Sequence, residues 1–203
     1  MAFLERARLV DAHLGLREVS SRYALASLLI EMLDRLSPEG LVGEEATRLF
    51  EFATSSLALL AEHDPTPTLR LLLELRALDA LGLRPELGRC VRCGRVAGAE
   101  VSPDHRVFFH VADGGIVCTL CSRSLDGLIP ATLGTLRALE AGLAAPPDVL
   151  TGVELTQREL VEAARLVFRF QRFHVGVELR SERFLEEALP IRRIDEASAS
   201  LPQ

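Results

Sequence analysis

Four cysteines carry the clearest chemistry in this 203-residue chain, and they form two C-x-x-C pairs. The first pair is Cys90 and Cys93, and the second is Cys118 and Cys121. Two residues between thiols let both sulfurs of a pair bind one tetrahedral ion, and two such pairs complete an all-thiolate shell. The spacing therefore predicts one structural zinc ion held by all four cysteines.

Three other uses of these thiols fit the sequence less well. Disulfides need an oxidising compartment, and the residues after Met1 do not form the basic and apolar regions of a signal peptide. A thioredoxin-like redox pair needs a βαβ context, which the flanking pattern lacks. Catalytic zinc needs an open coordination position, which four thiolates would fill. We therefore favour a structural metal.

The residues between the two pairs are typical of a β-hairpin. Residues 107–111 and 116–118 read as short strands, joined by a turn at Asp113-Gly114-Gly115 that lets the second strand deliver Cys118. Gly94 follows the first pair, where a tight knuckle needs backbone freedom. We leave His105 and His110 outside the metal shell because four thiols already fill it.

The rest of the chain has the apolar period of helices. A lead-in at residues 3–17 is expected to be extended. Thr66 and Pro67 mark one helix start, and Thr156 with Glu159 forms the capping box of another. The predicted helices cover residues 18–36, 44–62, 66–81, 129–143 and 156–175, with a final helical turn at 181–185.

These elements predict a mainly α fold, a helical bundle with an inserted small four-cysteine module that is zinc-ribbon-like. The third helix is apolar nearly all round, so we expect it to be central. The predicted divisions are residues 1–85 for the N-terminal part of the helical domain, 86–128 for the zinc-binding module, 129–190 for the C-terminal helices that complete the helical domain, and 191–203 for a disordered tail.

Composition narrows the class of protein. An apolar content of 48% suits a globular protein, and no apolar run is long enough to span a membrane, so we expect a cytoplasmic protein. The formal net charge of −6 argues against a surface that binds nucleic acid over its whole extent. With no Trp and one Tyr, aromatic platforms for stacking bases are scarce.

An arginine-rich edge is predicted on the helix at 156–175. A helical projection places Arg158, Glu162, Arg165, Arg169 and Arg172 in one stripe, and we expect the apolar remainder of that helix, Phe173 included, to be buried. The stripe has two readings. Glu162 can pair with its arginine neighbours and simply support the helix, or the arginines can bind phosphates or a partner's carboxylates.

Several linked motifs resemble those of the RecO family of bacterial recombination mediators. The first two are Leu81-Gly-Leu-Arg-Pro-Glu-Leu87, which leads into the Cys90 pair, and Gly114-Gly115, which precedes the second pair. The others are Ile129-Pro-Ala-Thr-Leu133, Phe173-His-Val-Gly176 and Arg180-Ser-Glu-Arg-Phe-Leu185. The resemblance runs from about residue 14 to residue 185.

The resemblance implies an α-helical domain with an inserted zinc module, preceded in the family by an N-terminal OB-fold that this sequence is expected to lack. The chain would then be a truncated protein, a fragment or a paralogue without that domain. The resemblance also implies binding to DNA, to RecR and to the acidic tail of single-stranded DNA-binding protein, with DNA binding weak where the OB-fold is absent. Candidate residues for DNA or the partner are Arg165, Arg169, Arg172, Arg180 and Arg183.

No catalytic constellation stands out in the sequence. We identify no phosphate-binding Gly-rich loop, no nucleophile beside a credible base, and no carboxylate pair that spacing singles out. The expected role is therefore binding rather than catalysis, as a RecO-like mediator. The alternative is a zinc-stabilised helical adaptor between proteins that is unrelated to DNA repair.

Overall fold

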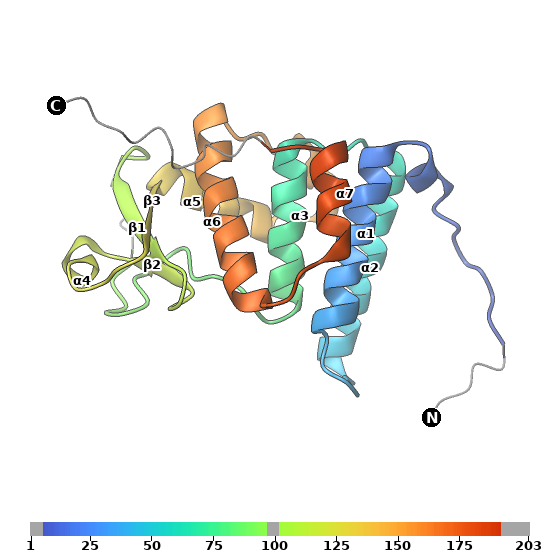
Figure 1. The fold of residues 1–203 in the computed structure, drawn as a ribbon, viewed down its shortest axis with the longest axis horizontal. Coiled ribbons are helices and arrows are strands. Elements are labelled where there is room, and N and C mark those ends of the chain that lie inside the picture. The colour runs from blue at the N-terminus through green and yellow to red at the C-terminus, as the bar shows by residue number, and fades with distance from the viewer. Residues whose placement is uncertain (1–5, 97–101, 192–203) are drawn as a thin grey trace.

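The computed structural model describes residues 6–96 and 102–191. Within these ranges, helices form the body of the molecule and a small β-sheet lies at one end of it (Figure 1). The mainly α fold predicted from the sequence is confirmed. The elements in chain order are η1 (Leu14–Arg17), α1 (Ser20–Leu36), α2 (Glu44–Glu62), α3 (Pro67–Ala80), β1 (Arg106–His110), β2 (Gly115–Val117), α4 (Thr119–Ser122), β3 (Leu128–Thr132), α5 (Leu133–Ala144), η2 (Pro147–Gly152), α6 (Gln157–Val175) and α7 (Arg180–Ala188).

Helix α3 is the centre of the helical body. It begins as predicted, with the Thr66 hydroxyl accepting a hydrogen bond from the Leu69 N–H at 3.1 Å and Pro67 in the first turn. It packs against α1, α2, α5 and α6, and Figure 1 shows it between α6 and the α1–α7 pair. Because neighbours surround it, even Arg70 and Glu74 on this helix are buried, and they pair with each other at 2.8 Å.

Helices α6 and α7 complete the body from the C-terminal side. The predicted capping box starts α6, with Thr156 accepting from the Glu159 N–H while the Glu159 carboxylate accepts from the Thr156 N–H. Helix α7 is longer than the single turn predicted and packs along α1. Ile191, the last described residue, is buried, and the remainder of the expected tail at 192–203 lies outside the described residues.

The sheet corrects one prediction from the sequence. Residues 129–132 were expected to begin a helix, but they form β3, which pairs antiparallel with β1 and gives the strand order β2-β1-β3. Burial alternates along β3, with Ile129 and Ala131 inward and Pro130 outward, and this period of two favours a strand. The helix starts only at Leu133, where the Thr132 side chain accepts from the Thr135 N–H.

The start of the chain also differs in part from expectation. Residues 6–13 have no regular structure, but a short 3-10 turn, η1, interrupts the predicted extended lead-in and packs against α1 and α2. The first helix then begins at Ser20.

The sheet packs on the helices rather than standing apart from them. Phe109 of β1 and Ile129 of β3 are fully buried in the same apolar core as α3 and α6. The Phe109 ring meets the Phe170 ring of α6 edge to face, with 5.8 Å between the ring centres. The elements that carry the cysteines are therefore anchored to the helical body.

Candidate metal centre

The structure brings the four cysteines together. One sulfur from each of them lies within 4.8 Å of the other three, and Cys93 Sγ and Cys118 Sγ are 3.8 Å apart. The cluster could hold a metal ion. Cys90 is buried and Cys93 is exposed, so the site lies at the surface with one side closed by the protein.

The first pair sits on a tight knuckle. The Gly94 N–H donates to the Cys90 carbonyl, and the Cys90 N–H donates to the Arg95 carbonyl, both at 2.8 Å. Gly94 has a φ of 71°, in the left-handed region that favours glycine. The backbone freedom expected at Gly94 is therefore used in the structure.

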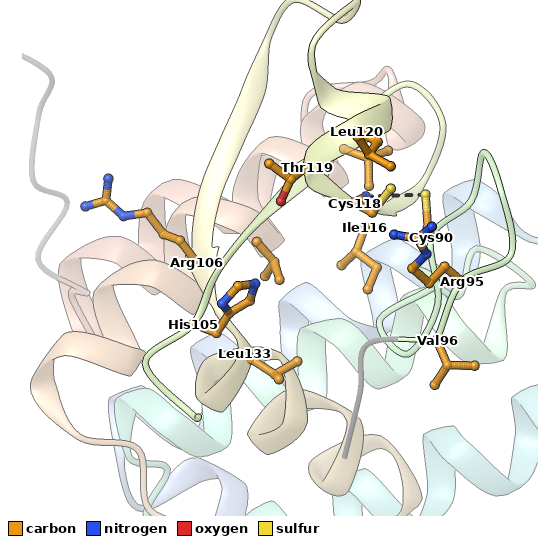
Figure 2. Close-up of a pocket in the computed structure, with 12 residues that line it drawn as sticks. Cys90, Arg95, Val96, His105, Arg106, Ile116, Cys118, Thr119, Leu120 and Leu133 are labelled. Atoms are coloured by element: carbon orange, nitrogen blue, oxygen red, sulfur yellow. Dashed lines mark hydrogen bonds between the residues drawn. The ribbon is translucent and has the colours of Figure 1, made fainter. Parts of the chain in front are cut away.

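The second pair is delivered by the end of β2. Cys118 follows that strand directly and precedes the short helix α4, which carries Cys121. The backbone N–H of Cys118 donates to the Cys90 sulfur at 3.3 Å, a contact that joins the two pairs (Figure 2). Such N–H to sulfur bonds stabilise a thiolate and are common around metal-bound cysteines.

The chain leading to the first knuckle runs along β2. Val91 N–H donates to the Ile116 carbonyl, and Ile116 N–H donates to the Glu86 carbonyl, each at 2.9 Å. The two backbones approach so closely at Gly115 that a Cβ there would lie 2.4 Å from a Val91 methyl carbon. The sheet thus fixes the distance between the two cysteine pairs.

The thiols influence one another strongly. Burial alone would raise the pKa of Cys90, but N–H groups of Cys118, Cys93 and Arg92 point at its sulfur, and the pKa falls to about 6. The pKa of Cys121 rises to about 12, first because its thiol hydrogen-bonds to Cys118. Without a cation the cluster therefore favours a mixture of thiols and thiolates, and a bound metal ion would favour loss of the remaining protons.

A cavity of about 220 Å³ adjoins the cysteines. It has an apolar wall that includes Ile116 and Leu133, and His105 lies at its edge outside the sulfur cluster (Figure 2). Arg106 also belongs to the lining, but its side chain points away from the cysteines in Figure 2.

The arginine-rich edge of α6 is only partly as expected. Glu162 pairs with Arg158 at 3.3 Å, but its other oxygen accepts hydrogen bonds from the Thr132 N–H and from the Thr132 and Thr135 hydroxyls at 2.7–2.9 Å. Glu162 therefore ties α6 to the start of α5 instead of pairing with Arg165. Within residues 6–96 and 102–191, Arg165 makes no ion pair.

The C-terminal part of this edge faces water. Arg169 and Arg172 are exposed, and Arg172 has no ion-pair partner among the described residues. The expectation that Phe173 is buried is wrong, because 58% of its surface is exposed, although its ring meets the His174 ring in a T-shaped contact. Phe173 follows exposed Arg169 by four residues, and residues four apart in a helix share one face, so the side that exposes Arg169 also exposes Phe173.

The two arginines of α7 lie on a different helix pair. Helix α7 packs on α1, whereas α6 packs on α3 and α5. The Arg180 N–H donates to Glu31 of α1 at 2.9 Å, and the Arg183 side chain pairs with Glu187 at 3.0 Å. The Arg180 contact uses the backbone N–H only, and the Arg183 side chain is 90% exposed, so both guanidinium groups remain candidates for binding a partner.

Two residues near the metal centre were missed from the sequence. Arg92, between the cysteines of the first pair, donates two hydrogen bonds to Asp113 in the hairpin turn. The only sequence signal is an arginine inside one C-x-x-C and an aspartate in the turn before the other, and 21 residues separate them.

Comparison with known proteins places this geometry in a family. Residues 17–183 match the family described as Recombination protein O C terminal. The chain belongs to the RecO family. It is 29% identical over 189 residues to the DNA repair protein RecO of Syntrophus aciditrophicus, a match that covers 92% of this chain and 70% of that protein.

Two further relatives carry the same name. The RecO protein of Anaeromyxobacter dehalogenans strain 2CP-1 is 31% identical over 192 residues, covering 93% of this chain and 71% of the relative. That of Bacillus subtilis is 27% identical over 184 residues, covering 91% and 68%. The resemblance seen in the sequence motifs is confirmed. No helix among the described residues is long and apolar enough to cross a membrane.

Proposed function

We propose that this chain acts in DNA repair and recombination by binding, as the helical and zinc-containing part of a RecO-type mediator. The observation that carries the proposal is the four-sulfur cluster, which lies within the family match and is anchored to the helical core. A role in DNA repair follows the name of the relatives and is favoured over the unrelated adaptor. A cytoplasmic location, where thiols stay reduced, belongs to the same proposal.

Zinc is the metal that we assign to the cluster. Zinc binds thiolates in a tetrahedron with a metal–sulfur distance of about 2.3 Å, which places neighbouring sulfurs about 3.8 Å apart. In the structure, Cys93 Sγ and Cys118 Sγ are 3.8 Å apart. Four thiolates leave no position for water or substrate, so the ion would hold the two knuckles together and would not act on a substrate.

The surface that we assign to a protein partner is the arginine edge of α6 together with the exposed residues at and just after its C-terminus. Arg165 and Arg172 have no ion-pair partner among the described residues, and exposed Phe173 and Val177 follow them. Guanidinium groups beside exposed apolar side chains suit an acidic peptide with an apolar end, such as the tail of single-stranded DNA-binding protein. RecR and DNA are the other proposed partners. With a net charge of −6, DNA binding should be weak and strongly salt-dependent.

Metal analysis tests the zinc assignment. Protein purified without added zinc should contain close to one zinc ion per chain, and Cys118→Ser should lower that content sharply. Chelation should increase amide hydrogen exchange around both cysteine pairs before it affects α3. A metal-free protein with the same protection pattern would contradict the assignment.

Peptide binding tests the partner assignment. Fluorescence anisotropy with a labelled acidic tail peptide should report micromolar affinity, and Arg172→Ala should weaken it about tenfold, which corresponds to about 1.4 kcal/mol. Arg48→Ala, which removes an exposed arginine on α2, is the matched control and should leave the affinity unchanged. Tight, salt-resistant DNA binding without any peptide binding would contradict the partner assignment and indicate that the chain acts by binding DNA.

A further inference from the structure

A side-chain network connects the metal knuckle to the hairpin turn. Arg92 donates from Nε to Asp113 Oδ2 at 2.6 Å and from Nη2 to Asp113 Oδ1 at 2.9 Å, so the guanidinium and the carboxylate meet in a two-point contact. Arg92 lies between the two cysteines of the first pair, and Asp113 lies in the turn that leads to the second pair. The contact therefore spans the two halves of the candidate metal centre.

The carboxylate is itself held in place. Asp113 Oδ2 lies 2.7 Å from Nδ1 of His110 at the end of β1. The turn is closed by the Gly114 N–H, which donates to the Val111 carbonyl at 3.1 Å. The Val111 carbonyl also lies 2.9 Å from the His174 imidazole on α6. The acceptor of the Arg92 contact is thus fixed on a turn that is bonded to the helical body.

The Cys90 side of the first knuckle is held more firmly by the rest of the protein than the Cys93 side. On the Cys90 side, the Val91 N–H is bonded to the Ile116 carbonyl of β2, and Cys90 is buried. Cys93 is exposed, and Arg92 directly precedes it. Opening the knuckle around Cys93 would expose the metal to attack by a competing ligand, and this motion requires the Arg92–Asp113 contact to break.

We propose that Arg92 and Asp113 are positioning residues of the metal centre, which hold the Cys93 side of the knuckle closed and so slow metal loss. The inference rests on the zinc assignment of the proposed function. Contacts beyond the ligands fix the orientation of the ligands, and their removal typically lowers metal affinity about 10- to 100-fold. Water screens this contact because Arg92 is half exposed, so its effect on overall stability should be small.

The experiment measures the rate of zinc transfer from the folded, zinc-loaded protein to a coloured chelator. Arg92→Ala and Asp113→Asn should each speed transfer roughly tenfold or more, and the double variant should be no faster than the faster single one, because both changes break the same contact. Arg92→Lys keeps the charge but not the two-point geometry and should give an intermediate rate. Arg89→Ala removes a neighbouring, more exposed arginine that pairs with Glu86, and its rate should match that of the parent protein.

Two further measurements separate positioning from general destabilisation. Cobalt-substituted protein should keep the thiolate-to-cobalt absorption bands of four-sulfur coordination in every variant, and thermal unfolding of the metal-free proteins should change little. Zinc transfer from Arg92→Ala or Arg92→Lys at the parental rate would overturn the inference. Absence of zinc and of cobalt binding in the parent protein would instead overturn the metal assignment itself.

Discussion

Glu31 on α1 caps the N-terminus of α7 from 150 residues away, and its removal gives a prediction with a clear dependence on pH. Its carboxylate accepts hydrogen bonds from the Arg180 N–H at 2.9 Å, the Ser181 N–H at 2.8 Å and the Ser181 hydroxyl at 2.5 Å. Burial alone would raise the pKa of Glu31, but the bonds from Ser181 and Arg180 lower it from 4.5 to about 2. We expect Glu31→Gln to destabilise the protein at pH 7.

The size of the effect follows from this pKa. A pKa shift from 4.5 to about 2 corresponds to about 3 kcal/mol of unfolding free energy if the whole shift contributes to stability. Water reaches the carboxylate and screens it, so we expect about 1–2 kcal/mol, the usual contribution of a helix cap. Because the folded pKa is the lower one, this stability is present above pH 4.5 and is lost as the pH falls towards 2.

Urea denaturation followed by circular dichroism measures the difference between the two proteins. At pH 7 the free energy of unfolding of Glu31→Gln should be about 1–2 kcal/mol lower than that of the parent protein, as expected for the loss of a helix cap. This difference should shrink steadily below pH 4.5. Glu39→Gln, in the exposed loop after α1, is the control for the loss of one negative charge. Metal release in acid should affect the parent protein, Glu31→Gln and Glu39→Gln alike, so it does not change the difference between them. A difference that stays constant down to pH 2.5 would refute the capping argument.

Two more substitutions test the core and the sheet. Arg70→Ala should lower the free energy of unfolding by about 3–5 kcal/mol, because it leaves the buried Glu74 carboxylate without its guanidinium partner. A loss below about 1 kcal/mol in urea denaturation would contradict this. Gly115→Ala should loosen the contact between β2 and the first knuckle, because the added Cβ would lie 2.4 Å from Val91 Cγ1 and 2.8 Å from the Glu86 carbonyl oxygen. Lower zinc content after purification is the expected readout, and parental zinc content with unchanged hydrogen exchange at Ile116 would argue against it.

Local signals explain what could be predicted from the sequence. The starts of α3 and α6 were predicted correctly because their caps involve residues only three positions apart, Thr66 with Leu69 and Thr156 with Glu159. The knuckle glycine, Gly94, also follows from its neighbours alone. The cysteine cluster was predictable because its spacing reflects the geometry of one ion.

Contacts between distant residues explain what was missed. Glu31 meets Ser181 and Arg92 meets Asp113 only after the helices and the sheet have packed, and nothing in the local sequence marks these pairs. Residues 129–132 were read as helical because a helix does follow them, but pairing with β1 residues that lie 20 to 26 positions earlier decides their conformation. Tertiary contacts thus overrode the local pattern.

The junction between β3 and α5 has no spare residue. Thr132 is the last residue of the strand, caps the helix that begins at Leu133, and is bonded through its N–H and hydroxyl to Glu162 on α6. One added residue here would shift the strand register, remove the cap and displace both contacts with Glu162. Natural insertions and deletions should therefore avoid this junction and accumulate in exposed connections such as the loop between α1 and α2. The same loop would be the better place to insert a tag or a reporter domain without disturbing the metal centre.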